Sequence, residues 1–330
     1  MLLDNHGRPL SYLRLAVTDR CNLRCFYCMP AEGISYLPKK ELLSYEEMRR
    51  LVRLLAAMGI YKIRITGGEP FVRRDLIPFM YELRQIPGVR ELHLTTNGVL
   101  THRYLDDLEA LQIDSVNLSL DSLDRARFFQ ITRRDELPQV LKTYEGLLAR
   151  RIKTKINAVV MAGQNTEDLI PLAEMARQAP IEVRFIEEMP FNGEGAHYAE
   201  LLWTYRKIQE KLQEAYPKMY PRENAPFATA QCFGIPGFLG SIGIIAAFSR
   251  TFCGTCNRIR ITAQGQLKTC LYDEGVLNVR DLLRQYPGDD QAIEEAFLLA
   301  FQNRPRDGFE AEQKRTQFQT VHESMSTIGG

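Results

Sequence analysis

The feature that most constrains the fold is a regular alternation of short β-type runs with helical segments along the first two-thirds of the 330-residue chain. The predicted strands are 12–17, 62–66, 91–95, 115–120, 153–160 and 181–187. Segments such as 45–58 and 166–178 follow them and repeat apolar residues every three or four positions. Strands that alternate with helices predict a parallel sheet. Periodicity alone leaves two α/β architectures open, a partial (β/α)6 barrel and a doubly wound sheet.

Four of the predicted strands carry a cation, although buried parallel strands are normally apolar throughout. These cations are Arg14, Arg64, Lys155 and Arg184. Their neighbours of opposite parity are apolar, so the apolar side can pack under the helices while the cations point into the barrel interior. An unpaired buried charge costs about 3–5 kcal/mol, so the pattern favours a bound polyanion such as a triphosphate. Internal neutralisation by Glu182 and Glu187 is the alternative.

The first cysteine group, CxxxCxxC, follows the first predicted strand directly and consists of Cys21, Cys25 and Cys28. Three thiolates suit an iron–sulfur cluster or zinc, but no histidine lies nearby to complete a structural zinc site. An iron–sulfur cluster held by these residues would leave one iron open. Tyr27, directly before the last cysteine, could stack beside a flat ligand at that iron. Three structural or zinc-binding cysteines remain the alternative.

A second incomplete triad lies near the other end of the chain and consists of Cys253, Cys256 and Cys270. Two open-site clusters in one cavity could divide their work, because one could generate a radical while the other holds a substrate. The seventh cysteine, Cys232, is interpreted as a buried small hydrophobe. An odd cysteine count, two metal-type spacings and no N-terminal targeting pattern favour the reducing cytoplasm over a disulfide framework.

Polar motifs follow several predicted strands. In the segment 66–70, two glycines would permit close approach to a ligand, and Glu69 could receive a ligand ammonium group. Thr95 and Ser119 place hydroxyl groups near the ends of the third and fourth strands. Turns and helix caps are the alternative interpretation of these motifs. Arg258 and Arg260 alternate after Cys256 and would share one face beside the second triad, unless they lie on a solvated strand edge.

Composition is that of an ordinary globular chain of about two domains, with 45% hydrophobic residues and a formal net charge of +1. This near balance of charge makes no general case for a nucleic-acid partner. The longest apolar run, around 242–248, is too short to cross a bilayer. We therefore expect neither nucleic acid nor membrane as a partner.

The CxxxCxxC segment, followed by Gly-Gly-Glu-Pro after the second strand, resembles the radical S-adenosylmethionine (SAM) superfamily, in which the open iron chelates SAM. The chain also resembles the enzyme family that catalyses the first step of molybdenum cofactor biosynthesis. The features that carry this resemblance are the second triad, the strand at 184–187 and the ending 325–330. The loop 191–195 differs mildly from the pattern of that family. The resemblance implies an open, partial (β/α)6 barrel over 1–225. It also implies an auxiliary-cluster region with a Gly-Gly tail over 226–330.

By the same resemblance, each triad holds a [4Fe–4S] cluster, the first of which binds SAM. The residues lining the SAM pocket would be Tyr27, Gly68, Ser119 and Met189. The residues binding GTP would be Arg14, Arg64, Thr95, Lys155, Arg258 and Arg260. Arg184 is expected to take part in the reaction because it lies near Met189 in the chain. The tail residues Gly329 and Gly330 are expected to reach into the active site, with a frayed end as the alternative.

The implied reaction begins when a deoxyadenosyl radical removes the ribose 3′ hydrogen of GTP. The C3′ radical then attacks guanine C8, and an electron and a proton complete 3′,8-cyclo-7,8-dihydro-GTP. Implied partners are a flavodoxin- or ferredoxin-like electron donor and a downstream cyclic pyranopterin monophosphate synthase, and a homodimer is one allowed state. The sequence leaves open another dual-cluster radical SAM enzyme, or a non-catalytic sensor of a phosphate ligand with structural clusters.

Overall fold

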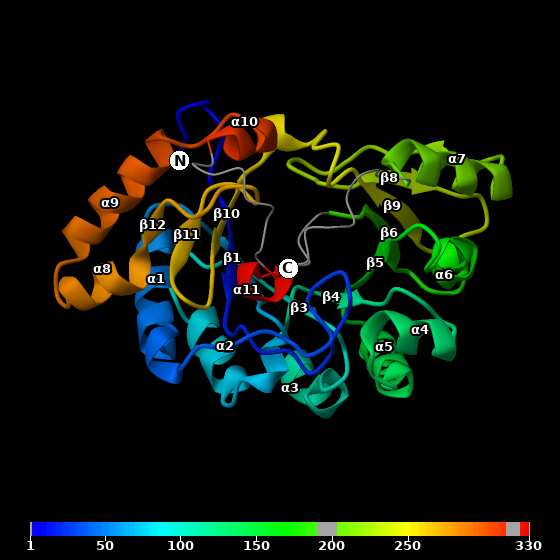
Figure 1. Cartoon of the computed structure of the whole chain (residues 1–330), viewed down its shortest axis with the longest axis horizontal. Helices are drawn as coiled ribbons and strands as arrows, with labels where there is room; N and C mark the ends of the chain where they lie inside the picture. Colours follow the sequence, from blue (N-terminus) through cyan, green and yellow to red (C-terminus); the bar gives the residue numbers. More distant parts are fainter. Residues whose placement is uncertain (1, 190–202, 315–323, 330) are drawn as a thin grey trace.

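The computed structural model describes residues 2–189, 203–314 and 324–329, so Gly330 and the loop 191–195 lie outside the described residues (Figure 1). The six predicted strands are present, and no boundary differs from its prediction by more than one residue. They are β1 (Tyr12–Ala16), β2 (Lys62–Thr66), β3 (Glu91–Thr96), β4 (Ser115–Ser119), β5 (Thr154–Val160) and β6 (Glu182–Glu187). Local periodicity was therefore sufficient to find the strands.

The described strands form one sheet in the order β12-β11-β10-β1-β2-β3-β4-β5-β6-β9-β8-β7. Strands β1 to β6 are neighbours in chain order, and every pair among them is parallel. A doubly wound sheet would reverse its strand order at a switch point. The unbroken order excludes that alternative, and the two outermost strands do not pair with each other. The prediction of an open, partial barrel is confirmed.

Strands from the last third of the chain extend both edges of this six-stranded unit. At one edge, β9 (Ser241–Ile245) runs parallel to β6 and is followed by antiparallel β8 (Gln231–Gly234) and β7 (Tyr220–Pro221). At the other, β10 (Arg258–Ile261) runs parallel to β1 and is followed by antiparallel β11 (Gln266–Lys268) and β12 (Leu277–Asn278). The pairing of β10 with β1 brings a segment from the last third of the chain beside its first strand.

Most of the helices cover the outer face of the sheet, whereas the last one, α11, lies over the inner face (Figure 1). Those after the first six strands are α1 (Tyr45–Ala57), α2 (Leu76–Arg84), α3 (Leu105–Ala110), α4 (Arg125–Thr132), α5 (Leu137–Ala149), α6 (Leu169–Gln178) and α7 (Tyr205–Ala215). The later ones are α8 (Val279–Gln285), α9 (Asp290–Gln302), α10 (Gly308–Gln313) and α11 (Met325–Ile328). Short 3-10 turns lie at Lys39–Glu41, Pro70–Val72, Thr101–Arg103, Thr166–Asp168 and Cys253–Thr255. Within the described ranges, no helix is long and apolar enough to cross a membrane.

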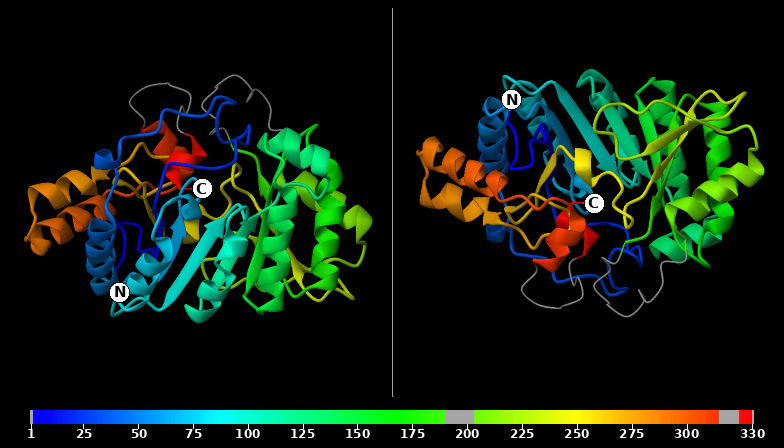
Figure 2. Two further views of the ribbon diagram at one scale, coloured as in Figure 1. Left: turned by 90° about the horizontal axis from the view of Figure 1, so that it is seen from below. Right: turned by 90° about the horizontal axis from the view of Figure 1, so that it is seen from above.

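Local sequence explains where individual helices begin. Helix α1 starts at Ser44, whose hydroxyl accepts from the Glu47 backbone while the Glu47 carboxylate accepts from the Ser44 N–H, as a capping box requires. The apolar face of α1 packs on the sheet, and Figure 2 shows α8 and α9 beside α1 in both of its views. The β10 edge of the sheet is therefore closed by helices from the two ends of the chain.

The core lies between the sheet and these helices. The apolar neighbours of the strand cations are completely buried there: Leu13, Leu15, Ile63, Ile65, Ile156, Val183 and Phe185. The strand cations occupy the positions of opposite parity and therefore face the interior of the open barrel, which we call the lumen. The parity prediction from the sequence is thus confirmed.

Candidate functional site

The two cysteine triads lie at opposite ends of the parallel strands. Cys21 to Cys28 follow the carboxyl end of β1, whereas Cys253 and Cys256 directly precede β10. Since β10 runs parallel to β1, with Tyr12 opposite Arg258, its start lies at the amino end of the sheet. A strand rises about 3.3 Å per residue, so a five-residue strand separates the two ends by roughly 13–17 Å. The lumen therefore lies between the two triads.

The loop with the first triad is held from two sides. Its backbone amides at Arg24 and Phe26 donate to the carbonyls of Thr132 (2.9 Å) and Ile131 (3.1 Å) at the end of α4. From the other side, the amide of Gly68 donates to the Thr18 carbonyl at 2.9 Å. The carboxyl edge of the barrel is thus a set of interlocked loops around the cysteines.

The Gly-Gly-Glu-Pro turn after β2 packs tightly against the loop that precedes the first triad. A Cβ atom on Gly68 would lie 2.3 Å from the carbonyl oxygen of Arg20, so the glycine allows close approach of the chain to itself. The completely buried Glu69 carboxylate accepts from the amides of Phe71 (3.1 Å) and Asn97 (2.7 Å). Burial raises the pKa of Glu69 to about 7. These donors fix the Glu69 carboxylate at the carboxyl edge of the barrel, and its role toward a ligand ammonium group stays a prediction.

The four residues predicted to line a SAM pocket all come from the carboxyl edge. Gly68 follows β2, Ser119 ends β4, and Met189 follows β6. The Tyr27 hydroxyl donates to Asp121 Oδ2 at 2.8 Å, while Asp121 Oδ1 accepts from the Val159 amide at 2.8 Å. Burial raises the pKa of Asp121 to about 6. These contacts fix the Tyr27 side chain beside the first triad.

The strand register gathers five of the six predicted GTP-binding residues in one region of the lumen. Arg260, Arg14 and Arg64 are register partners across β10, β1 and β2. Arg258 lies in the adjacent row opposite Tyr12, closer to Cys256. Thr95 on β3 accepts from Arg64 Nη1 at 3.5 Å. Residues in register on parallel strands face the same side, so these side chains share one region of the lumen.

The other two lumen cations, Lys155 and Arg184, are paired with a carboxylate. Glu182 accepts from Lys155 Nζ at 2.7 Å and from Arg184 Nε at 2.6 Å. Burial opposes ionisation of Glu182, but the charges of Arg184 and Lys155 lower its pKa to about 2. The internal-neutralisation alternative is therefore correct for Lys155 and Arg184.

Glu187 does not contribute to this neutralisation. Its parity is opposite to that of Glu182, so it faces the helices and is completely buried. Its carboxylate accepts from the Tyr205 amide at 2.6 Å and from the amide and hydroxyl of Ser249, each at 2.8 Å. The expectation that Glu187 could neutralise lumen cations is wrong for this reason.

The arginines beside the second triad have a different environment. Within the part of the chain that the structure describes, no carboxylate forms an ion pair with Arg64, Arg258 or Arg260. Burial and the neighbouring Arg258 lower the pKa of Arg260 to about 10. Burial alone would raise the pKa of Tyr12, yet the charges of Arg64 and Arg14 lower it to about 8. This side of the lumen therefore has a strong positive potential.

Several buried polar atoms in the lumen lack partners among the described residues: Thr66 Oγ1, Asn117 Oδ1 and Asn157 Oδ1. These residues lie on β2, β4 and β5 at positions of the same parity as the lumen cations. Buried polar groups are usually hydrogen-bonded. A polar ligand in the lumen would satisfy them.

The end of the chain enters the lumen. Helix α11 begins at Ser324, whose hydroxyl donates to the Cys28 carbonyl at 2.6 Å, and lies over the inner face of the sheet near β1 (Figure 1). The Gly329 carbonyl accepts from Arg14 Nη2 at 3.4 Å and Arg260 Nη1 at 3.3 Å. The described part of the tail thus connects the first triad with the arginines.

Gly329 occupies a position that suits only glycine. Its φ is +82°, and a Cβ atom there would lie 2.7 Å from Thr66 Oγ1 and 2.9 Å from Ala16 Cβ. Both the left-handed backbone and the close neighbours exclude a larger residue.

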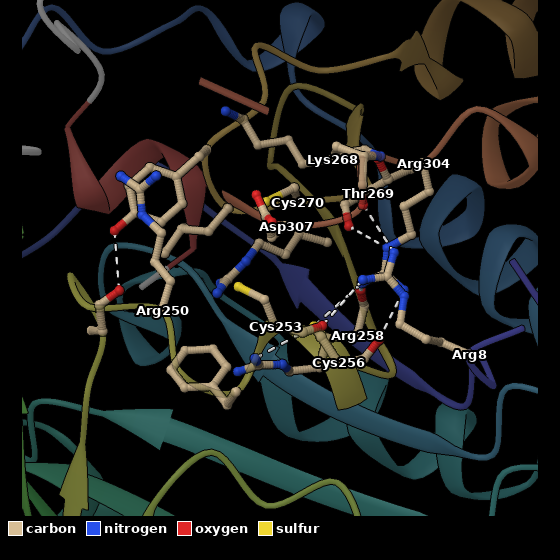
Figure 3. A pocket seen from close by; sticks show the side chains of 16 residues that line it. Arg8, Arg250, Cys253, Cys256, Arg258, Lys268, Thr269, Cys270, Arg304 and Asp307 are labelled. Carbon is tan, nitrogen blue, oxygen red and sulfur yellow. Dashed lines mark hydrogen bonds between the residues drawn. The ribbon is translucent and has the colours of Figure 1, made fainter. Parts of the chain in front are cut away.

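The second triad lines a pocket rich in cations (Figure 3). The basic residues of this pocket are Arg8, Arg250, Arg258, Arg260, Lys268 and Arg304. Cys256 Sγ accepts from Arg304 Nη2 at 3.3 Å and from Arg258 Nη2 at 3.5 Å. Burial would raise the pKa of the Cys256 thiol, but the charges of Arg258 and Arg304 lower it to about 6. Cys256 is therefore poised to act as a thiolate ligand.

Sequence analysis missed Arg8, Arg250 and Arg304 in this pocket. None of them lies within a cysteine motif, and only tertiary packing brings them to Cys253, Cys256 and Cys270. The sequence shows only that Arg304 stands directly before a proline, after an amphipathic helical segment, which marks the end of a helix. That signal does not point to a cysteine site.

All seven cysteines are thiols in the structure. The interpretation of Cys232 as a buried hydrophobe is wrong, because its side chain is partly exposed and donates to Glu182 Oε1 at 3.7 Å. Among the described residues, no three Cys, His, Asp or Glu side chains converge tightly enough to hold a single metal ion. The thiolates of a four-iron cluster each bind a different iron, so a cluster needs no such convergence.

Two family profiles together match most of the chain. The Radical SAM superfamily profile matches residues 15–176, and the Molybdenum Cofactor Synthesis C profile matches residues 181–310. The GTP 3′,8-cyclase of Syntrophomonas wolfei is 39% identical over 327 residues, which cover 96% of this chain and 99% of that protein. The mitochondrial GTP 3′,8-cyclase of Arabidopsis thaliana is 39% identical over 296 residues, covering 89% and 75%.

The chain belongs to the GTP 3′,8-cyclase family. Its match to the Radical SAM superfamily profile implies SAM and a [4Fe–4S] cluster as cofactors. Some relatives are longer: molybdenum cofactor biosynthesis protein 1 of Homo sapiens is 40% identical over 293 residues, covering 88% of this chain but 46% of that protein. The chain spans about half the length of these longer relatives.

Solved structures support the fold. The structure of Streptococcus suis SuiB bound to S-adenosylmethionine superposes with a TM-score of 0.61 at 17% identity, covering 86% of this chain and 67% of that chain. Methylornithine synthase gives a TM-score of 0.50 at 17% identity, covering 64% of each chain. At these identities the likeness concerns the fold alone.

The residues present fit the cofactors of this family. Three cysteines lie at each end of the lumen, and sulfur is the ligand that iron–sulfur clusters prefer; Cys256 also has a lowered pKa. Between the triads lie the unpartnered polar atoms of Thr66, Asn117 and Asn157 and the arginines without a carboxylate. The donor set therefore suits two clusters with a polar, anionic ligand between them.

Proposed function

We propose that the chain is a GTP 3′,8-cyclase, which converts GTP into (8S)-3′,8-cyclo-7,8-dihydroguanosine 5′-triphosphate in the first step of molybdenum cofactor biosynthesis. The observation that carries this proposal is the set of lumen arginines without a carboxylate, placed between two cysteine triads. Arginine is well suited to bind phosphate groups. The relative that matches this chain along nearly its whole length bears the name of this activity.

We assign SAM to the carboxyl edge of the barrel. Cys21, Cys25 and Cys28 would hold the cluster that binds SAM, and the pocket would be lined by Tyr27, Gly68, Ser119 and Met189. The interlocked loops at this edge support the assignment, since the hydrogen bond from Tyr27 to Asp121 orients an aromatic ring beside the cysteines. Cys253, Cys256 and Cys270 would hold the second cluster at the amino end.

We assign GTP to the space between the triads. Arg14, Arg64, Arg258 and Arg260 would bind its phosphates through charge-assisted hydrogen bonds, with Thr95 beside Arg64. Lys155 would contribute less, because Glu182 already neutralises it. The guanine base would face the second cluster.

In this arrangement the chain supplies orientation. When bound, the first cluster and SAM would supply a 5′-deoxyadenosyl radical for removal of the ribose 3′ hydrogen, and formation of the bond between C3′ and guanine C8 would then need one electron from the external donor and one proton. Anchoring the phosphates would hold C3′ near the carboxyl edge, because the anchored end lies deep in the lumen. Arg184, Gly329 and Gly330 would assist the reaction from the β6 side and from the tail.

We place residues 1–225 in the barrel unit and 226–330 in the auxiliary-cluster region. The free thiols support a reducing compartment, and we propose the cytoplasm. A flavodoxin- or ferredoxin-like donor would supply electrons, a cyclic pyranopterin monophosphate synthase would take the product, and a homodimer is the proposed assembly. These partner assignments rest on the family.

Anaerobic turnover tests the proposal directly. The reconstituted protein is incubated with SAM, dithionite and GTP, and the cyclised nucleotide and 5′-deoxyadenosine are measured by liquid chromatography and mass spectrometry. We expect both products and about eight irons per chain. A protein that binds GTP and holds its clusters but forms neither product would instead be a sensor of a phosphate ligand.

A further inference from the structure

Arg304 lies behind the second triad, in the segment that follows α9. Its side chain is only 2% exposed, and each of its five N–H groups has an acceptor. These acceptors are the carbonyls of Thr269 (2.9 Å), Cys256 (2.9 Å) and Arg258 (2.9 Å), Asp4 Oδ2 (3.1 Å) and Cys256 Sγ (3.3 Å). Figure 3 shows the guanidinium of Arg304 near Thr269 and Cys256. The protein itself thus uses the full hydrogen-bonding capacity of this arginine.

The acceptors of Arg304 belong to both segments that carry the triad. Cys256 and Arg258 lie at the start of β10, whereas Thr269 directly precedes Cys270. A planar guanidinium with fixed donor directions sets the spacing of the groups that it bonds. Arg304 therefore sets the position of Cys270 relative to Cys256.

Residues from the start of the chain support Arg304. Asp4 is completely buried at its side chain and accepts from Arg304 at 3.1 Å and from Arg8 Nε at 2.7 Å. Arg8 in turn donates to the Cys253 carbonyl at 3.1 Å and to the Pro305 carbonyl at 2.9 Å. The Asp4 carboxylate thus compensates two buried guanidinium groups and joins them into one network around the triad.

The sulfur of Cys256 receives two guanidinium donors with different surroundings. Arg258 lies in the row of lumen residues, where the proposed function assigns it to GTP. Arg304 has every donor engaged within the protein, so a ligand in the lumen does not displace it from the sulfur. A positive hydrogen-bond donor on a ligating thiolate favours the reduced, more negative form of a cluster.

We propose that Arg304 is a positioning residue that sets the geometry and the reduction potential of the iron–sulfur cluster at the second triad. The inference rests on the proposed function, because it takes Cys253, Cys256 and Cys270 as cluster ligands. Arg304 acts through Cys256 and Cys270 and touches no substrate.

Substitution of Arg304 in the full chain tests this role. Wild type, Arg304→Gln, Arg304→Lys and the control Arg306→Gln are reconstituted anaerobically, and iron is counted. The electron paramagnetic resonance signal that is absent from Cys256→Ala is assigned to the cluster at the second triad. A redox titration then measures how this signal depends on the potential. Arg306 is a suitable control because its side chain is 76% exposed and, among the residues that the structure describes, forms an ion pair only with Asp307.

We expect Arg304→Gln to be harder to reduce. At the potential where half of the wild-type cluster is reduced, the ratio of reduced to oxidised cluster should fall about tenfold, which is 59 mV for one electron. Arg304→Lys should shift less, because it keeps the charge, but its spectrum should change because the fork of donors is lost. Arg306→Gln should match wild type. A fully loaded Arg304→Gln with wild-type spectrum and potential would overturn the proposal.

If Arg304→Gln loses about four irons, Arg304→Lys becomes the deciding variant. Restored iron with an altered spectrum would support a role for the guanidinium geometry, whereas a wild-type spectrum and potential in Arg304→Lys would overturn it. Failure of the proposed function is recognised separately. A wild-type chain with about four irons and no signal that depends on Cys256 would refute the second cluster itself.

Discussion

The two cysteine triads have the same number of thiols but different electrostatic surroundings. Burial raises the pKa of Cys21 to about 11 and that of Cys28 to about 12, and the hydrogen-bond donors to Cys21 are the Leu23 amide and the Asn97 side chain. At the second triad, burial also raises the pKa of Cys253 and Cys270, but Arg258 and Arg304 donate to Cys256 and lower its pKa to about 6. Equal ligand sets can therefore serve different tasks, because the second triad stands beside cations suited to an anionic substrate.

The lumen cations show a related contrast. Lys155 and Arg184 share the carboxylate of Glu182, whereas Arg64, Arg258 and Arg260 form no ion pair with a carboxylate of the described residues. The electrostatic potential is therefore more positive on the side of the lumen next to the second triad than on the side of Lys155 and Arg184. Its cations should contribute most to nucleotide binding.

The largest expected effect separates the two triads. Cys25→Ala should abolish cleavage of SAM, because the proposed SAM-binding cluster loses a ligand. Cys256→Ala should still form some 5′-deoxyadenosine but no cyclised nucleotide, because the proposed substrate-side cluster is lost. Quantifying both products under anaerobic conditions checks this. Equal loss of 5′-deoxyadenosine in the two variants would contradict the division of tasks.

The next effect separates the two sides of the lumen. Arg260→Ala should weaken GTP binding by about 10- to 150-fold, since a hydrogen bond with a charged group contributes about 1.5–3 kcal/mol. Lys155→Ala should weaken it less than about tenfold, because Glu182 already pairs with Lys155. Calorimetry with GTP, with GMP as a control ligand, measures both. Equal losses would show that pairing with Glu182 does not lower the contribution of Lys155.

Gly329 tests the connection between the triads. Gly329→Ala should reduce cyclised product roughly 10- to 100-fold, because strain at positive φ costs about 1–3 kcal/mol and the new methyl group would meet Thr66 and Ala16. Iron content and SAM binding should change little. Gly237→Ala is the matched control, since Gly237 has a φ of +83° and nothing within 4 Å of its Cβ position. Wild-type turnover in Gly329→Ala would remove the tail from the mechanism.

The smallest expected effect concerns pH and Glu182. The pKa of Glu182 is about 2 in the folded chain against an ordinary value of 4.5, so its stabilising effect is present above pH 4.5 and is lost as pH falls towards 2. Wild type should lose about 2 kcal/mol of unfolding free energy from this group between pH 7 and pH 3. Glu182→Gln should lack this component. Urea unfolding at several pH values measures the slope, and equal slopes in both proteins would show that Lys155 and Arg184 do not hold Glu182 ionised.

Local sequence pattern determined much of this protein. The alternation of apolar and polar residues located all six barrel strands to within one residue and placed Arg14, Arg64, Lys155 and Arg184 on the inner face. It succeeded because side-chain direction alternates with period two along any strand, whatever the strand pairs with. Both cysteine triads were also visible in the sequence, since ligand spacing within one loop is a local property.

Pairing between distant segments was decided only by the tertiary structure. The parallel pairing of β10 with β1 placed Arg258 and Arg260 beside Tyr12 and Arg14, and no local pattern states which sheet edge a late strand will join. For the same reason, the sequence could not show that Glu182 rather than Glu187 neutralises two cations, or that Glu69 is held by backbone amides. Arg304 and Asp4 come from opposite ends of the chain, and they meet at Cys256 because the energy of a buried charge network depends on which segments fold together.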